Sequence, residues 1–316
     1  MSAQVKNTSA HERPVGSVRG IETILAFTDF SDHGAVAVRR AGQLAAQHDA
    51  DLRVVHVVTP LTLSPLPAWL ESDDARVRMA DAEAALTALA TQARSRHSVR
   101  VETQVLAGTL LDEILRESAA ADLLVLGARG SGLIRRALLG TTALRLLTKC
   151  DRPILVVRHD VVASYSRILV PVDLNDNADT TFQAVLALAP SAEVHVLHAY
   201  ELMHEGKLRM VGVGDSAIRK FRQAARARVK GRLLAMLARH ELSTRRFTPH
   251  LQRGHAVRLI RASAARIQAD LIVMSKRSRS KLEDILLGSV TERVVADVQN
   301  DVLVVPLVRD RKIAAR

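Results

Sequence analysis

The sequence predicts an α/β fold built as two tandem, doubly wound domains, each with a five-stranded parallel sheet. Three observations carry this prediction: short apolar runs alternate with helical patterns, several runs are aliphatic throughout, and the whole order occurs twice. Alternating strands and helices imply parallel pairing with right-handed crossovers, and fully apolar strands are typical of a sheet covered on both faces. Ligands of such sheets bind at the carboxyl ends of the strands.

The first copy contains five apolar runs, which predict strands at residues 23–27, 52–58, 99–106, 123–126 and 153–157. Apolar residues at helical spacing predict the intervening helices at residues 35–45, 73–96, 111–120 and 143–147. Ser31 or Asp32 is placed to cap the first of these helices, because both side chains can accept hydrogen bonds from free N–H groups.

The same order returns from Ser166, which indicates an internal duplication. Landmarks of the two copies keep separations of 146 or 148 residues: Gly108 and Gly254, Asp122 and Asp270, Gly140 and Gly288. We therefore predict domains at residues 21–159 and 160–308, between a flexible N-terminal tail of residues 1–20 and a basic tail of residues 309–316.

A long, arginine-rich helix is expected in the second copy at residues 217–240. Its predicted buried face consists of Ile218, Phe221, Ala225, Val229, Leu233 and Met236. The arginines between these positions form either a solvated surface or a contact with an acidic protein or anionic lipid.

Composition and charge restrict the function. The chain has 48% hydrophobic and 25% charged residues, as folded globular proteins do. Its single cysteine, Cys150, excludes an intramolecular disulfide, and neither a signal peptide nor an apolar run of about 20 residues is present, so we expect a soluble, cytoplasmic protein. The formal charge of +12 favours an anionic partner, but 3% aromatic residues leave few rings for base stacking, so nucleic-acid and membrane contacts are disfavoured.

Glycines follow the fourth predicted strand of the first copy. The two segments concerned are Gly127-Ala128-Arg129-Gly130 and Gly140-Thr141-Thr142. Glycine lets the backbone approach an anion closely, and free N–H groups at a helix start can donate to phosphate. This arrangement predicts a phosphate site, although glycines that merely end a strand and cap a helix would give the same pattern.

An aspartate after the first strand, followed by Gly-x2-Gly-x9-Gly-Ser/Thr after the fourth, resembles the pattern of the universal stress protein family. The matching residues are Asp29, Gly127, Gly130, Gly140 and Thr141. The resemblance covers nearly all of residues 21–307 and implies a Rossmann-like, adenine nucleotide alpha hydrolase-like fold. It also implies ATP as ligand, with magnesium entering only through the bound ATP, and a stress-response or regulatory role.

The resemblance implies a nucleotide site in the first domain. The implied contacts to the adenosine portion are Phe27, Thr28, Asp29 and Val57. The implied contacts to ribose and phosphates are Leu126, Gly127, Ala128, Arg129, Gly130, Gly140, Thr141 and Thr142. Two alternatives stay open: Asp29 as a helix-capping acid, and Arg129 as a surface residue instead of a phosphate ligand.

The second copy departs from this pattern, because Ser275 and Ser278 replace the two leading glycines. A serine resists a left-handed backbone by about 1 kcal/mol and fills space near a ligand. The retained residues of this degenerate site are Asp173, Gly288, Ser289, Val290 and Thr291. We expect domain 2 to bind ATP weakly, to bind another anion through Lys276 and Arg277, or to serve as a structural partner.

No catalytic residues are predicted, since no Ser-His-Asp set, paired carboxylates or P-loop is present. Histidines at the strand ends, His56 and His198, are not expected to bind metal. Two other functions stay open: a slow ATPase or nucleotidyl-transferring enzyme, and a basic-surface scaffold or nucleic-acid-binding module.

The family resemblance further implies an intramolecular pseudo-dimer in which residues 154–157 and 303–305 lie close together. A homodimer stays open, and the protein partner is unknown.

Overall fold

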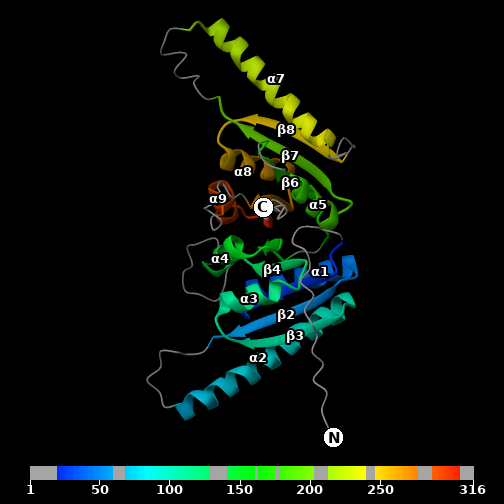
Figure 1. The fold of residues 1–316 in the computed structure, drawn as a ribbon. Coiled ribbons are helices and arrows are strands. Elements are labelled where there is room, and N and C mark those ends of the chain that lie inside the picture. Colours follow the sequence, from blue (N-terminus) through cyan, green and yellow to red (C-terminus); the bar gives the residue numbers. More distant parts are fainter. Residues whose placement is uncertain are drawn as a thin grey trace, which may run out of the picture.

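The computed structural model describes residues 20–59, 68–128, 141–160, 163–174, 178–202, 213–239, 246–276 and 287–306. The described residues up to 160 are called the first half below, and those from 163 onward the second half. They form one ten-stranded sheet in the order β3-β2-β1-β4-β5-β10-β9-β6-β7-β8 (Figure 1). The sheet is parallel within each half, and the halves meet at the antiparallel pair of β5 and β10.

The strands of the first half are β1 (Thr23–Phe27), β2 (Asp51–Val58), β3 (Val101–Ala107), β4 (Leu123–Gly127) and β5 (Ile154–Val157). Its helices are α1 (Asp32–His48), α2 (Ala68–His97), α3 (Leu110–Ser118) and α4 (Thr141–Lys149). The strands of the second half are β6 (Arg167–Pro171), β7 (Glu193–Tyr200), β8 (Phe247–Arg253), β9 (Leu271–Lys276) and β10 (Asp301–Pro306). Its helices are α5 (Asp179–Leu188), α7 (Asp215–Arg239), α8 (Ala256–Ile267) and α9 (Ser289–Asp297). The predicted element order is confirmed, and most predicted boundaries fall within a few residues of these.

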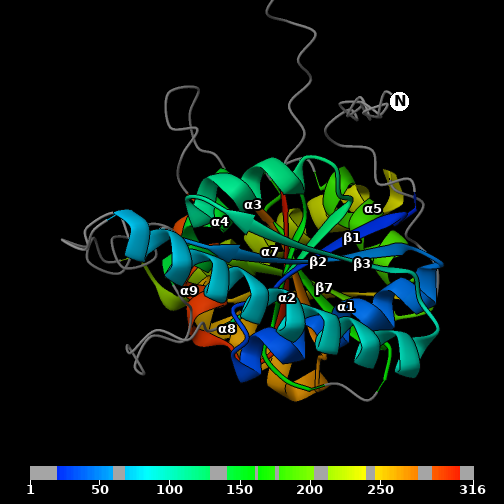
Figure 2. The ribbon, with the colours of Figure 1, turned by 90° about the horizontal axis from the view of Figure 1, so that it is seen from below.

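Helices cover both faces of the sheet, as the fully apolar strands predicted. One apolar layer packs under α1, α2, α5 and α7, and the other under α3, α4, α8 and α9. In the view of Figure 2, α3 and α4 lie on one side of the first-half strands, and α1 and α2 on the other. Strand residues alternate between the layers: Val54 contributes to the first and Val55 to the second.

The duplication extends to individual side-chain contacts. Asp122 accepts hydrogen bonds from the backbone of the first strand, at 3.0 Å from Thr23 N, and Asp270 does the same for Arg167 N at 3.1 Å. At the other end of the strands, His56 Nδ1 donates to a backbone carbonyl at 2.9 Å, and His198 Nδ1 repeats that contact at 2.9 Å. The two histidines therefore fasten the ends of neighbouring strands.

The seam between the halves is the pairing of β5 with β10, in which Leu155 lies opposite Leu303. This confirms the expectation that the last strands of the two copies lie close together. Because the pairing is antiparallel, the carboxyl ends of the other strands point to opposite edges of the sheet in the two halves.

A buried charged cluster crosses this seam. Asp301 Oδ2 lies 3.6 Å from Arg40 Nη2 and accepts a hydrogen bond from Tyr165 Oη at 2.7 Å. The Arg40 guanidinium also lies over the Tyr165 ring, 4.2 Å from its centroid. All three side chains are buried. Alignment of β1 and α1 with β6 and α5, and of β5 with β10, places the apolar residues Ile21, Ala184 and Pro153 at the equivalent positions, so the cluster occurs on one side of the seam only.

The predicted inner face of α7 is partly wrong. Ile218, Leu233 and Met236 are buried, but Phe221 is 40% exposed. A helix turns by about 100° per residue, so Phe221 lies roughly 60° from the row formed by Ile218 and Met236. It therefore stands on the flank of the helix and not over the sheet.

Candidate functional site

The carboxyl ends of β1, β2 and β4 meet at one edge of the first half. Pairing of β1 with β2 and with β4 brings together seven of the predicted site residues: Phe27, Thr28, Asp29, Val57, Leu126, Gly127 and Ala128. Thr141 and Thr142 begin α4. Arg129, Gly130 and Gly140 lie outside the described residues.

The turn after β1 is organised by its own side chains. The buried Thr28 hydroxyl accepts a hydrogen bond from Phe30 N at 3.1 Å. Asp29 Oδ1 accepts two, from Ser31 N at 3.1 Å and from Ser31 Oγ at 2.5 Å. Ser31 Oγ in turn accepts from Gly34 N at 3.1 Å and is the N-cap of α1. Asp29 therefore orients the capping serine instead of capping the helix itself.

Phe30 is a site feature that the sequence reasoning missed. Its backbone is left-handed, with φ of 62°, a conformation that is costly for a bulky residue and often found at functional sites. Its ring is 37% exposed and lies 4.3 Å from the His56 ring, centroid to centroid. The available signal was an aromatic residue directly after the strand-end Asp29 in a chain with few aromatics.

Gly127 differs from the prediction in its backbone conformation. The glycines with positive φ in the described part of the chain are Gly20, Gly108 and Gly254, so the left-handed backbone invoked for the leading glycine is wrong at Gly127. A Cβ atom there would lie 2.6 Å from the carbonyl oxygen of His33, in the first turn of α1. Close packing of α1 on the end of β4 therefore excludes a side chain at this position.

Leu126 and Ala128 have structural roles at the site edge. Both side chains are buried in the apolar layer under α3 and α4. The amide of Ala128 donates to the carbonyl oxygen of Val157 at 2.9 Å, so it continues the sheet ladder and cannot also donate to a phosphate. The first turn of α4, which begins at Thr141, has N–H groups without partners inside the helix, and these can donate to an anion.

The equivalent edge of the second half is built differently. Thr291 is buried, and its Oγ1 donates to the carbonyl oxygen of Ser275 at 3.3 Å. Ser289 and Val290 are exposed in the first turn of α9, after the N-cap Gly288. Asp173 follows β6 and is half-buried. Arg277 and Ser278 lie outside the described residues.

Lys276 takes the position that Ala128 has in the first half. Its Nζ donates across the seam to the carbonyl oxygen of Cys150 at 3.3 Å, where α4 ends. Burial lowers the pKa of the Lys276 ammonium, and the nearby Asp151 carboxylate opposes that shift. Lys276, one of the two residues of the alternative anion site, thus caps a helix of the other half.

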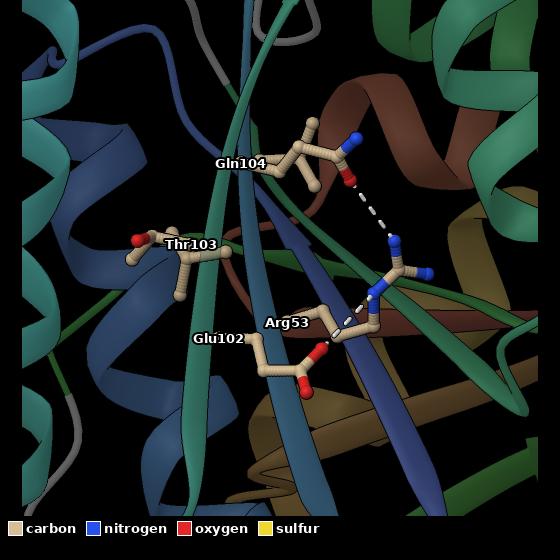
Figure 3. A pocket seen from close by; sticks show the side chains of 6 residues that line it. Arg53, Glu102, Thr103 and Gln104 are labelled. Atoms are coloured by element: carbon tan, nitrogen blue, oxygen red, sulfur yellow. Dashed lines mark hydrogen bonds and ion pairs between the residues drawn. The ribbon is translucent and has the colours of Figure 1, made fainter. Parts of the chain in front are cut away.

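A separate pocket of about 110 Å³ lies on β2 and β3 and contains none of the predicted site residues. Figure 3 shows Arg53 in it, reaching Gln104 at 3.2 Å and Glu102 at 4.0 Å. Glu117 lies closer, at 2.6 Å. Because carboxylates already neutralise its guanidinium, Arg53 does not make this pocket an anion site.

The second half carries a histidine pair at the position of Arg53 and Gln104. His195 Nδ1 and His250 Nε2 share a hydrogen bond of 2.9 Å, and Glu193 Oε1 lies 3.2 Å from His195 Nε2. Burial lowers the pKa of His250, and the neighbouring His195 and Arg266 lower it further.

Within the described ranges, no group of three His, Cys, Asp or Glu side chains could hold a metal ion. The helices of the same ranges include none with the length and apolar character of a membrane span.

Known proteins share this sequence pattern and this architecture. The family model described as the universal stress protein family matches residues 20–158 and again residues 164–306. A universal stress protein of Mycolicibacterium smegmatis is 27% identical over 300 residues, which cover 89% of this chain and 96% of that protein. One from Mycobacterium tuberculosis is 25% identical over 274 residues, covering 82% and 88%. The crystal structure of a universal stress protein from Archaeoglobus fulgidus has the same fold, with a TM-score of 0.67 at 21% identity over 92% of this chain and 97% of that chain. The chain belongs to the universal stress protein family.

Proposed function

We propose that the first half binds ATP at the edge formed by β1, β2 and β4, and that the protein acts in stress response or regulation instead of catalysing a reaction. One observation carries the proposal: the ordered turn of Thr28, Asp29 and Phe30 follows β1, which pairs directly with β4, so the turn lies at the same sheet edge as the end of β4. Such strand ends are where α/β sheets bind ligands.

The chemistry of the residues present fits an adenine nucleotide. The half-buried Asp29 carboxylate can accept hydrogen bonds from the adenosine portion, with one oxygen already held in place by Ser31. The exposed Phe30 ring offers a flat apolar surface next to it, against which a base can stack. The first turn of α4 supplies N–H groups and the positive end of a helix for the phosphates, and magnesium would enter with them.

The second half is proposed to bind ATP weakly or not at all. It has Leu174 in place of Phe30, and Ser275 in place of Gly127. Lys276 is turned toward Cys150 and the seam. These differences remove the stacking surface and change the backbone environment of the strand end, although Asp173 is retained.

Calorimetry on the nucleotide-free chain tests this division, with Asp29→Asn and Asp173→Asn as a matched pair. We expect one ATP per chain, an affinity at least about tenfold lower in Asp29→Asn, and unchanged binding in Asp173→Asn. Phe30→Leu, which copies the second half, is expected to weaken binding by roughly 1 kcal/mol, or about fivefold.

Three outcomes would overturn the proposal. They are no detectable binding, two equivalent sites per chain, and loss of binding in Asp173→Asn alone. Phosphate release is measured on the same samples, and steady turnover abolished by Asp29→Asn would assign an ATPase instead.

A further inference from the structure

Helix α7 is the most strongly basic element of the described chain. Over Asp215–Arg239 it has one acidic residue, Asp215, and eight basic ones. Seven of the basic side chains are exposed: Arg219, Lys220, Arg226, Arg228, Lys230, Arg232 and Arg239. Within the described part of the chain, no carboxylate forms an ion pair with Arg219, Lys220, Arg226, Arg228 or Lys230. The helix therefore presents a concentrated positive field to solvent.

This charge is not a requirement of the fold. Helix α2 occupies the equivalent place in the first half, and its sequence has five acidic and four basic residues besides His97. In Figure 1, α7 and α2 lie at opposite extremities of the molecule, each outside an edge strand of the sheet. Of these two outer helices, only α7 carries a large excess of basic residues.

The basic residues border both sides of the outward face of α7. At about 100° per residue, one flank carries Arg219, Arg226 and Lys230, and the other carries Arg228, Arg232 and Arg239. Between the flanks lie Lys220, Ala224, Ala227, Gly231 and Ala238, all exposed. From Lys220 to Arg239 this surface is roughly 30 Å long at 1.5 Å per residue.

The surface fits some anionic partners better than others. The apolar face of α7, with Ile218, Leu233 and Met236, already packs on the sheet, so it cannot enter a lipid interface. The two exposed large apolar residues, Phe221 and Leu234, are about 140° apart around the helix and form no seam for a partner helix. A polar, positively charged surface with few aromatics is typical of contacts with double-stranded nucleic acid.

We propose that the outward face of α7 docks on double-stranded DNA, independently of the nucleotide site. The major groove is about 12 Å wide and admits an α-helix, and phosphates border it on both sides. The small residues between the flanks would let the helix approach the groove, while the flanking arginines and lysines contact the two phosphate backbones. Such contacts position the protein without reading sequence.

The test is fluorescence anisotropy of the full chain with a labelled 30-base-pair duplex of arbitrary sequence between 50 and 200 mM salt. Six phosphate contacts, one for each flanking side chain, predict an affinity loss of roughly 1,800-fold across that range. The variant Arg226→Gln/Arg228→Gln/Lys230→Gln should bind at least ~10-fold more weakly at 50 mM salt, with a slope of log affinity against log salt shallower by about 2.7.

Two further variants separate α7 from net charge and from misfolding. Arg258→Gln/Arg261→Gln/Arg293→Gln removes the same charge from exposed positions on α8 and α9 and should bind as the parent does. Arg226→Lys/Arg228→Lys keeps the charge and should bind within about threefold of the parent, because a phosphate accepts either cation.

The proposal fails if the parent chain does not bind the duplex at 50 mM salt, or if the α8 and α9 variant loses as much affinity as the α7 variant. It also fails if phosphatidylserine vesicles bind the chain through α7 while the duplex does not, since the partner would then be a membrane.

Discussion

The end of β4 and the first turn of α1 are in contact through Gly127 and His33, where a Cβ on the glycine would lie 2.6 Å from the histidine carbonyl oxygen. Both atoms in that clash belong to the backbone or are attached directly to it, so no side-chain rotation relieves it. We expect Gly127→Ala to lower the free energy of unfolding by about 1–3 kcal/mol in the absence of nucleotide. Chemical denaturation of the ligand-free protein measures this.

Gly231→Ala is the matched control for that substitution. Gly231 lies in the exposed part of α7 and would give its Cβ open space. Alanine is the better helix former, so the free energy of unfolding should rise by about 0.5–1 kcal/mol. Equal stability of the Gly127→Ala variant and the parent would mean that α1 can move away from β4.

Removing either charge of the buried cluster at the seam should lower the free energy of unfolding, but by different amounts. Arg40→Met removes the counter-ion of Asp301 and the contact with Tyr165, and should cost about 3 kcal/mol of unfolding free energy. Asp301→Asn should cost less, because burial already raises the pKa of the Asp301 carboxyl and so penalises its charged form. Denaturation of Arg39→Met, whose partner Asp160 is exposed, should show less than about 1 kcal/mol. A larger loss in Asp301→Asn than in Arg40→Met would contradict this account.

Asp301 also predicts an unusual pH dependence. Because its pKa is raised in the folded protein, above the ordinary value of 3.8, the folded state holds this proton more tightly than the unfolded chain. The resulting stability is present below pH 3.8 and is lost as pH rises through the raised folded pKa. Relative to Asp301→Asn, the parent should therefore lose unfolding free energy as pH rises from 3.8 through the raised folded pKa. A difference that stays constant over this range would exclude the raised pKa.

His250, in the histidine pair of the second half, should change the stability with pH in the opposite direction to Asp301. The pKa of His250 is lowered from 6.5 by burial and by the neighbouring His195 and Arg266. The folded state therefore favours neutral His250, and this stability is present above pH 6.5 and lost as pH falls through the lowered pKa. Replacing His250 with Gln should reduce the fall in unfolding free energy between pH 7.5 and 5.5, as followed by urea denaturation. Parallel pH profiles for parent and variant would show that His250 does not titrate this way.

The sequence was sufficient for the order of elements and for the pairing of the last strands. Aliphatic runs such as Ile154–Val157 report burial on both faces directly, and the repeated order locates each strand twice. The turn after β1 was also predictable, because Asp29 and Ser31 act through neighbours two or three residues away.

Features that depend on distant parts of the chain could not be predicted. The requirement for Gly127 arises from where α1 packs, and the contact of Lys276 with Cys150 joins residues 126 positions apart across the seam. Phe221 was assigned to the wrong face because the helical pattern alone tolerates an apolar residue on the flank of the buried row. The left-handed backbone of Phe30 has no sequence signal of its own.

The one-sided cluster of Arg40, Tyr165 and Asp301 has a consequence for how this protein can change over generations. A homodimer of single domains must present every residue twice, so a useful change at one site is imposed on the other. Here one side of the seam carries a charged contact and the other has apolar residues at the equivalent positions, so the two sides are not interchangeable. In this single chain each half can therefore change without imposing the same change on the other.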